Sequence, residues 1–173
     1  MLKPVLRFYA QSFYLIIGFF LLLGLVHFFL FEPSIVDGVS MQETFHDGDI
    51  ILIKKLPLLF RKIERGDIVS INKGVAGALV VKRVMGLPGE HIEIKNGGIY
   101  ITNAKGETFT VDEPYLAPGL TTLPAEKYAA DYGVIPDFSY FVIGDNRPHS
   151  KDSRNYGFVS RDEIVGLVQP FLR

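Results

Sequence analysis

A long apolar segment near the start of the chain dominates its hydrophobic pattern. Residues 13–31 form a run of 19 positions that are apolar except for His27. An α-helix needs about 20 such residues to cross the hydrocarbon core of a bilayer. The run also ends without the small-x-small site at which a signal peptide is cleaved. The pattern therefore predicts a single transmembrane helix that is retained as an anchor.

The charges on either side of this segment predict its orientation. Lys3 and Arg7 precede it, whereas Glu32 follows it. Because positive residues are enriched on the cytoplasmic side of a membrane, we expect a cytoplasmic N-terminus and an extracytoplasmic body. The predicted organisation is a cytoplasmic end with its anchor over residues 1–31 and a β-rich domain over residues 32–173.

The body alternates short runs rich in Ile and Val with Gly, Asp and Asn. Short strands separated by turn residues are typical of an antiparallel all-β domain, and no long amphipathic helix is apparent. The sequence thus predicts a mainly β fold behind the anchor. The predicted strands are residues 50–53, 68–71, 78–85, 91–95, 98–103, 109–111, 140–143 and 164–171.

Three segments between these strands carry more specific signals. Asn96-Gly97 predicts a tight hairpin, because a type I′ turn requires positive φ at both central residues. Residues 113–136 are rich in Pro, Gly, Ala and Tyr without periodicity, and we expect an irregular surface segment there. Residues 54–65 place apolar side chains between two basic clusters. That pattern suits a membrane surface, and equally a loop whose apolar side chains enter the core.

Composition narrows the classes of function. The chain has 18 basic and 19 acidic residues, so no basic excess indicates a nucleic-acid partner. It contains no cysteine, which excludes disulfides, thiolate catalysis and Cys-based zinc sites. At 173 residues it is long enough for one domain with an appendage.

Two adjacent cations, Lys82 and Arg83, interrupt an apolar strand in the run LVVKRVMG. Side chains of a strand alternate between its faces, so the two cations cannot both point into solvent. A buried lysine without a carboxylate partner favours its neutral amine, which can act as a general base. The alternative is an edge strand on which Lys82 is simply exposed.

Two polar segments offer partners for such a base. Ser40 follows Asp37-Gly38 just after the predicted anchor. It is either a nucleophile close to the bilayer or an ordinary turn residue. Residues 144–154, GDNRPHSKDSR, are dense in charges and hydroxyls and predict an ordered polar network. Its candidate members are Asp145 or Asp152 paired with Arg147 or Arg154, with Ser150 free to bond an amine.

Together these stretches resemble the type I signal peptidases, membrane-bound serine proteases with a Ser-Lys dyad. The matching motifs are Ser40-Met41, Gly66-Asp67-Ile68-Val69, Val81-Lys82-Arg83-Val84 through Gly86-Leu87-Pro88-Gly89, and the GDNRPHSKDSR segment. The resemblance implies that Ser40 is the nucleophile and Lys82 its general base. It further implies that Ser150 orients the lysine, that Asp145 and Arg154 form a supporting pair, and that no cofactor or metal is used.

Two positions depart from the family pattern. Some members carry a hydroxyl two residues before the nucleophile, where this chain has Gly38, so the second oxyanion donor is absent, a backbone amide or water. Glu43 stands where the family usually has proline. A carboxylate near Lys82 would favour the ammonium form, and we expect a Glu43→Pro variant to be at least as active.

The resemblance also implies the partners. The substrates would be signal peptides of secretory precursors, whose extended small-x-small ends can add to a strand edge beside shallow apolar pockets. The enzyme would lie in the plasma (inner) membrane, in contact with the lipid bilayer. The candidate pocket walls are Val36, Met41, Phe45, Val80 and Val81.

Other functions remain open at this point. His149 with Asp145 or Asp152 could complete a Ser-His-Asp triad. The cluster His46-Asp47-Gly48-Asp49 could bind a metal weakly, although such a cluster is more often a turn. A non-enzymatic alternative is a membrane-tethered β-domain that binds partners without catalysis.

Overall fold

The computed structural model describes residues 2–73, 78–125 and 130–171. The chain divides into two units, Met1–Glu32 and Pro33–Arg173.

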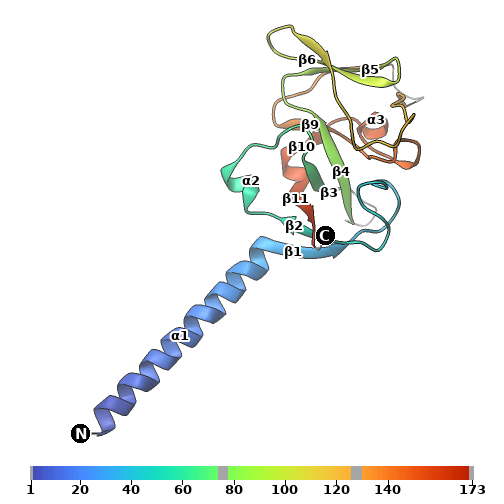
Figure 1. The fold of residues 1–173 in the computed structure, drawn as a ribbon. Coiled ribbons are helices and arrows are strands. Elements are labelled where there is room, and N and C mark those ends of the chain that lie inside the picture. Colours follow the sequence, from blue (N-terminus) through green and yellow to red (C-terminus); the bar gives the residue numbers. More distant parts are fainter. Residues whose placement is uncertain (1, 74–77, 126–129, 172–173) are drawn as a thin grey trace. The chain divides into compact units, whose positions relative to one another are not determined.

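The first unit is dominated by helix α1, Leu2–Leu30 (Figure 1). Every side chain of residues 13–24 is exposed along this helix. Among the residues that the structure describes, no helix has the length and apolarity that crossing a membrane requires. The predicted segment is therefore helical, but its transmembrane character is not confirmed.

The second unit contains two antiparallel sheets (Figure 1). The larger sheet has the strand order β1-β2-β11-β3-β4-β9-β10. Its members are β1 (Phe31–Ile35), β2 (Ile50–Lys54), β3 (Ile68–Asn72), β4 (Leu79–Gly86), β9 (Ser139–Ile143), β10 (Val159–Ser160) and β11 (Ile164–Pro170). The smaller sheet has the order β7-β6-β5-β8. Its members are β5 (His91–Lys95), β6 (Gly98–Thr102), β7 (Thr108–Thr110) and β8 (Asp131–Val134).

Short helical segments complete the unit. They are α2 (Pro57–Phe60), α3 (Ser153–Tyr156) and the 3₁₀ turns η2 (Arg147–His149) and η3 (Arg161–Glu163). The segments η2 and α3 lie in the polar 144–154 run, just after β9. They give this run the ordered conformation that its charge density predicted.

All eight predicted strands are present, with ends displaced by at most one residue. The predicted hairpin is also confirmed, because Asn96 and Gly97 have φ values of 52° and 78°. Three strands were missed, β1, β8 and β10. The prediction of a wholly irregular segment at 113–136 is wrong, since β8 lies within it and pairs with β5.

The alternating pattern of each sheet buries its apolar face. Ile92 and Ile94 of β5 are fully buried with Ile99 and Ile101 of β6, and they pack against residues of β4 and β9. A second cluster joins buried residues of β2 to the loop that follows β1. Its buried members are Val36, Met41, Phe45, Ile51, Ile53 and Val168. The segment that carries Ser40 is therefore anchored in the core on both sides of that residue.

The apolar side chains of residues 54–65 are partly buried and partly exposed. Ile63 is buried and Leu58 packs against the core. Leu59 and Phe60 of α2 are 74% and 80% exposed. The expectation that the apolar side chains of this segment enter the core is therefore confirmed for Leu58 and Ile63 only. Contact of Leu59 and Phe60 with a membrane surface stays a prediction.

The loop between β1 and β2 contains one strained residue, Glu43, with φ of 84°. Positive φ is unfavourable for residues with a Cβ, and proline is fixed near −65°. Proline cannot adopt this backbone, so the conformation of the loop argues against the expectation that Glu43→Pro is at least as active.

We predict that Glu43→Pro destabilises the protein by about 2 kcal/mol or more, because the loop must abandon its conformation. Glu43→Gly should keep or raise stability by about 1 kcal/mol, since glycine adopts positive φ without strain. Unfolding of the purified full chain by heat or urea measures both changes. Equal stability of the proline and glycine variants would show that the positive φ does not constrain this loop.

Candidate active site

Ser40 and Lys82 meet although 41 residues separate them in the chain. The Nζ atom of Lys82 lies 2.7 Å from Ser40 Oγ and donates to the Val81 carbonyl at 2.8 Å. Lys82 projects from β4 and is only 3% exposed. The amine can donate to the hydroxyl when charged and accept its proton when neutral, which is the geometry of a nucleophile and its base.

Burial changes the acidity of this amine. Desolvation lowers the pKa of Lys82 from 10.5 to about 8, against smaller opposing effects of Asp152 and Asp145. A substantial fraction of the amine is then neutral near pH 8. The sequence-based alternative of an exposed edge-strand lysine is wrong, because β4 lies between β3 and β9.

The neighbouring cation, Arg83, has a different partner. Its Nε and Nη2 atoms donate to the two carboxylate oxygens of Asp145 at 2.9 and 2.7 Å. Thr44 adds a hydroxyl that donates to the same carboxylate at 2.5 Å and accepts from Arg83 Nη2 at 3.2 Å. This buried network ties the loop after Ser40 to the strand that carries Lys82.

Asn146 provides a second tie to the same loop. Its backbone amide donates to the Ser40 carbonyl at 3.1 Å, and its side-chain Nδ2 donates to the Val39 carbonyl at 3.0 Å. The position of Ser40 is therefore set by hydrogen bonds to its own backbone as well as by packing.

The supporting pair implied by the family resemblance, Asp145 with Arg154, is wrong. Arg154 instead pairs with Asp152, through Nε at 2.9 Å and Nη2 at 2.9 Å. Asp152 also accepts from the Gly144 amide at 3.0 Å. Sequence reasoning included Asp152 among the alternatives, but side-chain direction within the loop could not be deduced from composition.

Ser150 does not bond the lysine in this structure. Its Oγ is buried and has no hydrogen-bond partner among the described residues. A Cβ built on Gly144 would lie 2.2 Å from Ser150 Oγ and 2.5 Å from the Ser40 carbonyl oxygen. Ser150 thus lies beside the backbone of the nucleophile loop, and its orienting role stays a prediction.

A third ion pair supports the site and was missed by sequence reasoning. Glu113 accepts two hydrogen bonds from the guanidinium of Arg147, one of them at 3.1 Å. Tyr115 donates to Glu113 at 2.8 Å, and its ring lies 3.8 Å from the guanidinium carbon of Arg83. The only signal in the sequence was the charge of Arg147, because Glu113 and Tyr115 come from a segment without periodicity.

Backbone amides in the nucleophile loop are available to bind an oxyanion. Among the described residues, neither the Ser40 nor the Met41 amide has a hydrogen-bond acceptor. The Gly38 amide is not free, since it donates to Asp47 Oδ1 at 2.7 Å. Gly38 has φ of 101°, which disfavours a serine at this position although the space is open.

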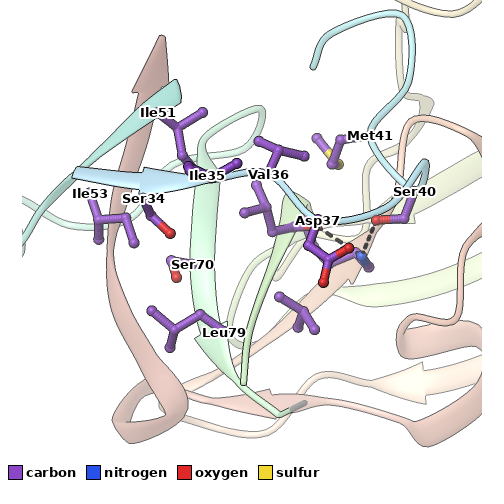
Figure 2. A pocket seen from close by; sticks show the side chains of 13 residues that line it. Ser34, Ile35, Val36, Asp37, Ser40, Met41, Ile51, Ile53, Ser70 and Leu79 are labelled. Atoms are coloured by element: carbon purple, nitrogen blue, oxygen red, sulfur yellow. Dashed lines mark hydrogen bonds between the residues drawn. The ribbon is translucent and has the colours of Figure 1, made fainter. Parts of the chain in front are cut away.

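A narrow cavity of about 90 Å³ extends from Ser40 and Lys82 along the sheet (Figure 2). Four of the five predicted wall residues line it, namely Val36, Met41, Val80 and Val81. Phe45 does not line it, although it is buried in the same core cluster as Val36 and Met41. Residues that the sequence did not single out form the far end, among them Ile53, Ser70 and Leu79.

The alternative triad is not supported by the contacts of His149. Its Nδ1 lies 3.1 Å from the side-chain oxygen of Asn146, and no bond joins it to Ser40 among the described residues. The His46–Asp49 cluster is a turn, in which the His46 amide donates to Asp49 at 2.7 Å. Neither segment adds a catalytic group.

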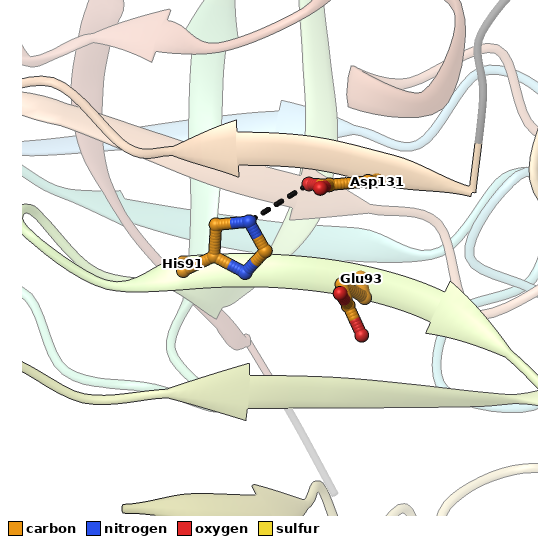
Figure 3. Close-up of side chains that lie close together, drawn as sticks. All are labelled: His91, Glu93 and Asp131. Atoms are coloured by element: carbon orange, nitrogen blue, oxygen red, sulfur yellow. Dashed lines mark ion pairs between the residues drawn. The ribbon is translucent and has the colours of Figure 1, made fainter. Parts of the chain in front are cut away.

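One cluster outside the active site has side chains of metal-binding type. His91, Glu93 and Asp131 bring ligand atoms within 4.8 Å of one another on β5 and β8 (Figure 3). His91 and Asp131 pair at 2.9 Å, and Lys95 pairs with Glu93. The cluster lies in the smaller sheet and shares no residue with the lining of the cavity beside Ser40, so it adds no group to the chemistry there.

Comparisons with known proteins identify the family of this chain. The model of a family described as signal peptidase, peptidase S26, matches residues 9–172. Signal peptidase I of Bacillus amyloliquefaciens is 42% identical over 147 residues, 82% of this chain and 74% of that protein. Signal peptidase I T of Bacillus subtilis (strain 168) is 41% identical over 153 residues, 84% of this chain and 76% of that protein.

Among solved structures, a crystal structure of a signal peptidase I from Enterococcus faecalis is 33% identical, with a TM-score of 0.49. The matched region covers 62% of this chain and 97% of the chain in that crystal structure. The family match spans most of the sequence, and the two Bacillus relatives each share more than 40% identity with it. The chain therefore belongs to the signal peptidase family, peptidase S26, and is a serine endopeptidase.

Proposed function

We propose that this enzyme removes signal peptides from secretory precursors with a dyad of Ser40 and Lys82. The observation that carries the assignment is the 2.7 Å contact between Ser40 Oγ and a buried amine of lowered pKa. Family membership supports the overall activity, and the contact supports these two residues in particular.

In the proposed mechanism, neutral Lys82 accepts the hydroxyl proton as Ser40 Oγ attacks the carbonyl of the scissile peptide bond. The tetrahedral oxyanion is stabilised by the backbone amide of Ser40, which has no internal acceptor. The ammonium then protonates the leaving amine, and the signal peptide remains as an ester on Ser40. Water, deprotonated by the same amine, releases it.

We also propose that helix α1 anchors the enzyme in the plasma (inner) membrane, with the N-terminus in the cytoplasm. The support is the row of exposed apolar side chains over residues 13–24, which water solvates poorly. Lys3 and Arg7 precede this row, and the positive-inside tendency gives the orientation.

Cleavage of a secretory precursor with a small-x-small site tests the dyad directly. Ser40→Ala and Lys82→Ala should each lower kcat/KM by at least about a thousandfold, because one removes the nucleophile and the other its base. His149→Ala is the matched control and should keep near wild-type activity. Cleavage at the wild-type rate by the lysine variant, or its loss in the histidine variant, would contradict the assignment.

The pKa of Lys82 predicts the pH dependence of the reaction. Only the neutral amine accepts a proton, so kcat/KM should rise with pH and reach half its plateau near pH 8. At pH 6 the neutral fraction, and hence the rate, should be about a hundredfold below the plateau. Rates with a fixed peptide between pH 5.5 and pH 9.5 at constant ionic strength provide the measurement. A half-point near pH 6.5 would indicate a histidine base instead.

A further inference from the structure

An aromatic ring lies against the guanidinium of Arg83, the residue that follows Lys82 in β4. The nitrogen atoms at the edge of this group are used in hydrogen bonds. Nε and Nη2 donate to Asp145, and Nη1 donates to the Gly66 carbonyl at 3.0 Å. The flat faces of a guanidinium carry no donors, but they stack on aromatic rings. The centroid of the Tyr115 ring lies 3.8 Å from the guanidinium carbon, so this ring covers one face.

Tyr115 is itself fixed by a second ion pair. Its hydroxyl donates to Glu113 at 2.8 Å, and the same carboxylate binds the guanidinium of Arg147. Arg147 in turn donates through Nε to the Gly144 carbonyl at 3.1 Å. Burial raises the pKa of the Tyr115 phenol, so the hydroxyl remains a donor to Glu113 in neutral and mildly alkaline solution.

The ring shields the ion pair beneath it from water. The side chain of Asp145 has no exposed surface, and that of Arg83 is 11% exposed. Attraction between two charges is stronger where water is excluded. Without the ring of Tyr115, water would reach the guanidinium and weaken its hold on Asp145.

The strength of this ion pair matters to the catalytic amine. The charged groups that favour the ammonium form of Lys82 are Asp152 and Asp145. The nucleophile loop presents the uncharged hydroxyl of Ser40 to the amine, and the residue opposite Lys82 in β3 is the apolar Val69. The protonation of Lys82 therefore depends on how fully the two carboxylates are neutralised by their arginines.

We propose that Tyr115 is a positioning residue for the catalytic dyad, which holds Arg83 on Asp145 and so keeps this carboxylate from stabilising the charged amine of Lys82. The inference rests on the proposed dyad and adds a residue that acts on it through Arg83. When the ring is lost, Arg83 neutralises Asp145 less completely, and the remaining negative charge favours the ammonium. The pH at which Lys82 becomes a base then rises.

The test is the pH profile of kcat/KM for cleavage of a peptide with a small-x-small site by the full-length enzyme. In the proposed mechanism, wild type reaches half its plateau near pH 8. Tyr115→Leu should raise this midpoint by about half a unit, which lowers the rate at pH 7 about threefold and leaves most of the plateau rate. Tyr115→Phe keeps the ring and should retain the wild-type midpoint.

Two further variants complete the test. Tyr115→Met also lacks a ring but fills more of the space, and it serves as the ring-free variant if thermal unfolding shows that Tyr115→Leu is not folded. Tyr100→Leu is the matched control, because the ring of Tyr100 lies 5.0 Å from Lys95 Nζ in the smaller sheet. This control removes a tyrosine beside a cation elsewhere and should keep the wild-type midpoint.

The outcomes separate the two proposals. A wild-type rate that does not rise with pH, or an inactive wild type, would contradict the proposed dyad itself. If wild type behaves as proposed, a ring-free variant with the wild-type midpoint would overturn the role of Tyr115, even if that variant is slower at every pH. A midpoint raised equally in Tyr115→Phe or in Tyr100→Leu would also overturn it. A midpoint raised only in the ring-free variants of Tyr115 is the result that we expect.

Discussion

The structure depends on keeping one amine, Lys82 Nζ, out of water and without a carboxylate partner. Two buried carboxylates, Asp145 and Asp152, are close enough to raise its pKa. Each is instead bound by an arginine, Arg83 for the first and Arg154 for the second. Because the arginines take up both carboxylates, desolvation prevails at the lysine and its pKa falls to about 8. The two ion pairs thus help to keep the pKa of Lys82 low, because the arginines bind the carboxylates that could otherwise pair with the lysine.

The same contacts fix the nucleophile. Arg83 follows Lys82 in β4, so the strand that positions the amine also binds Asp145 and, through it, Thr44 of the nucleophile loop. Asn146 bonds the backbone of Ser40 from the adjacent loop. Gly144 permits this approach, since a Cβ there would overlap Ser40 and Ser150.

Burial of the Lys82 amine also lowers the stability of the folded protein at neutral pH. Between pH 8 and pH 10.5 the unfolded chain binds more protons at Lys82 than the folded chain, so its contribution to stability rises with pH.

The sequence predicted those features that depend on periodicity and local turn chemistry. Alternation in β4 indicated that a cation must be buried, and Asn96-Gly97 specified its hairpin. Partner choice among charges was not predictable, because Asp145 and Asp152 lie in one loop and each could reach several arginines. The positive φ of Glu43 could likewise not be predicted, because the residue is not a glycine. The short strands β8 and β10 are held by their neighbours rather than by a pattern of their own.

The most direct test of this arrangement is the titration of Lys82 itself. Lysine side chains labelled with ¹³C at the ε carbon report their protonation by NMR, and the signal lost in Lys82→Arg assigns the residue. The buried environment, in which arginines bind both nearby carboxylates, predicts a pKa of about 8 in the folded wild-type enzyme. A value near the ordinary 10.5 would contradict it, because Lys82 would then be charged at neutral pH and unable to activate Ser40.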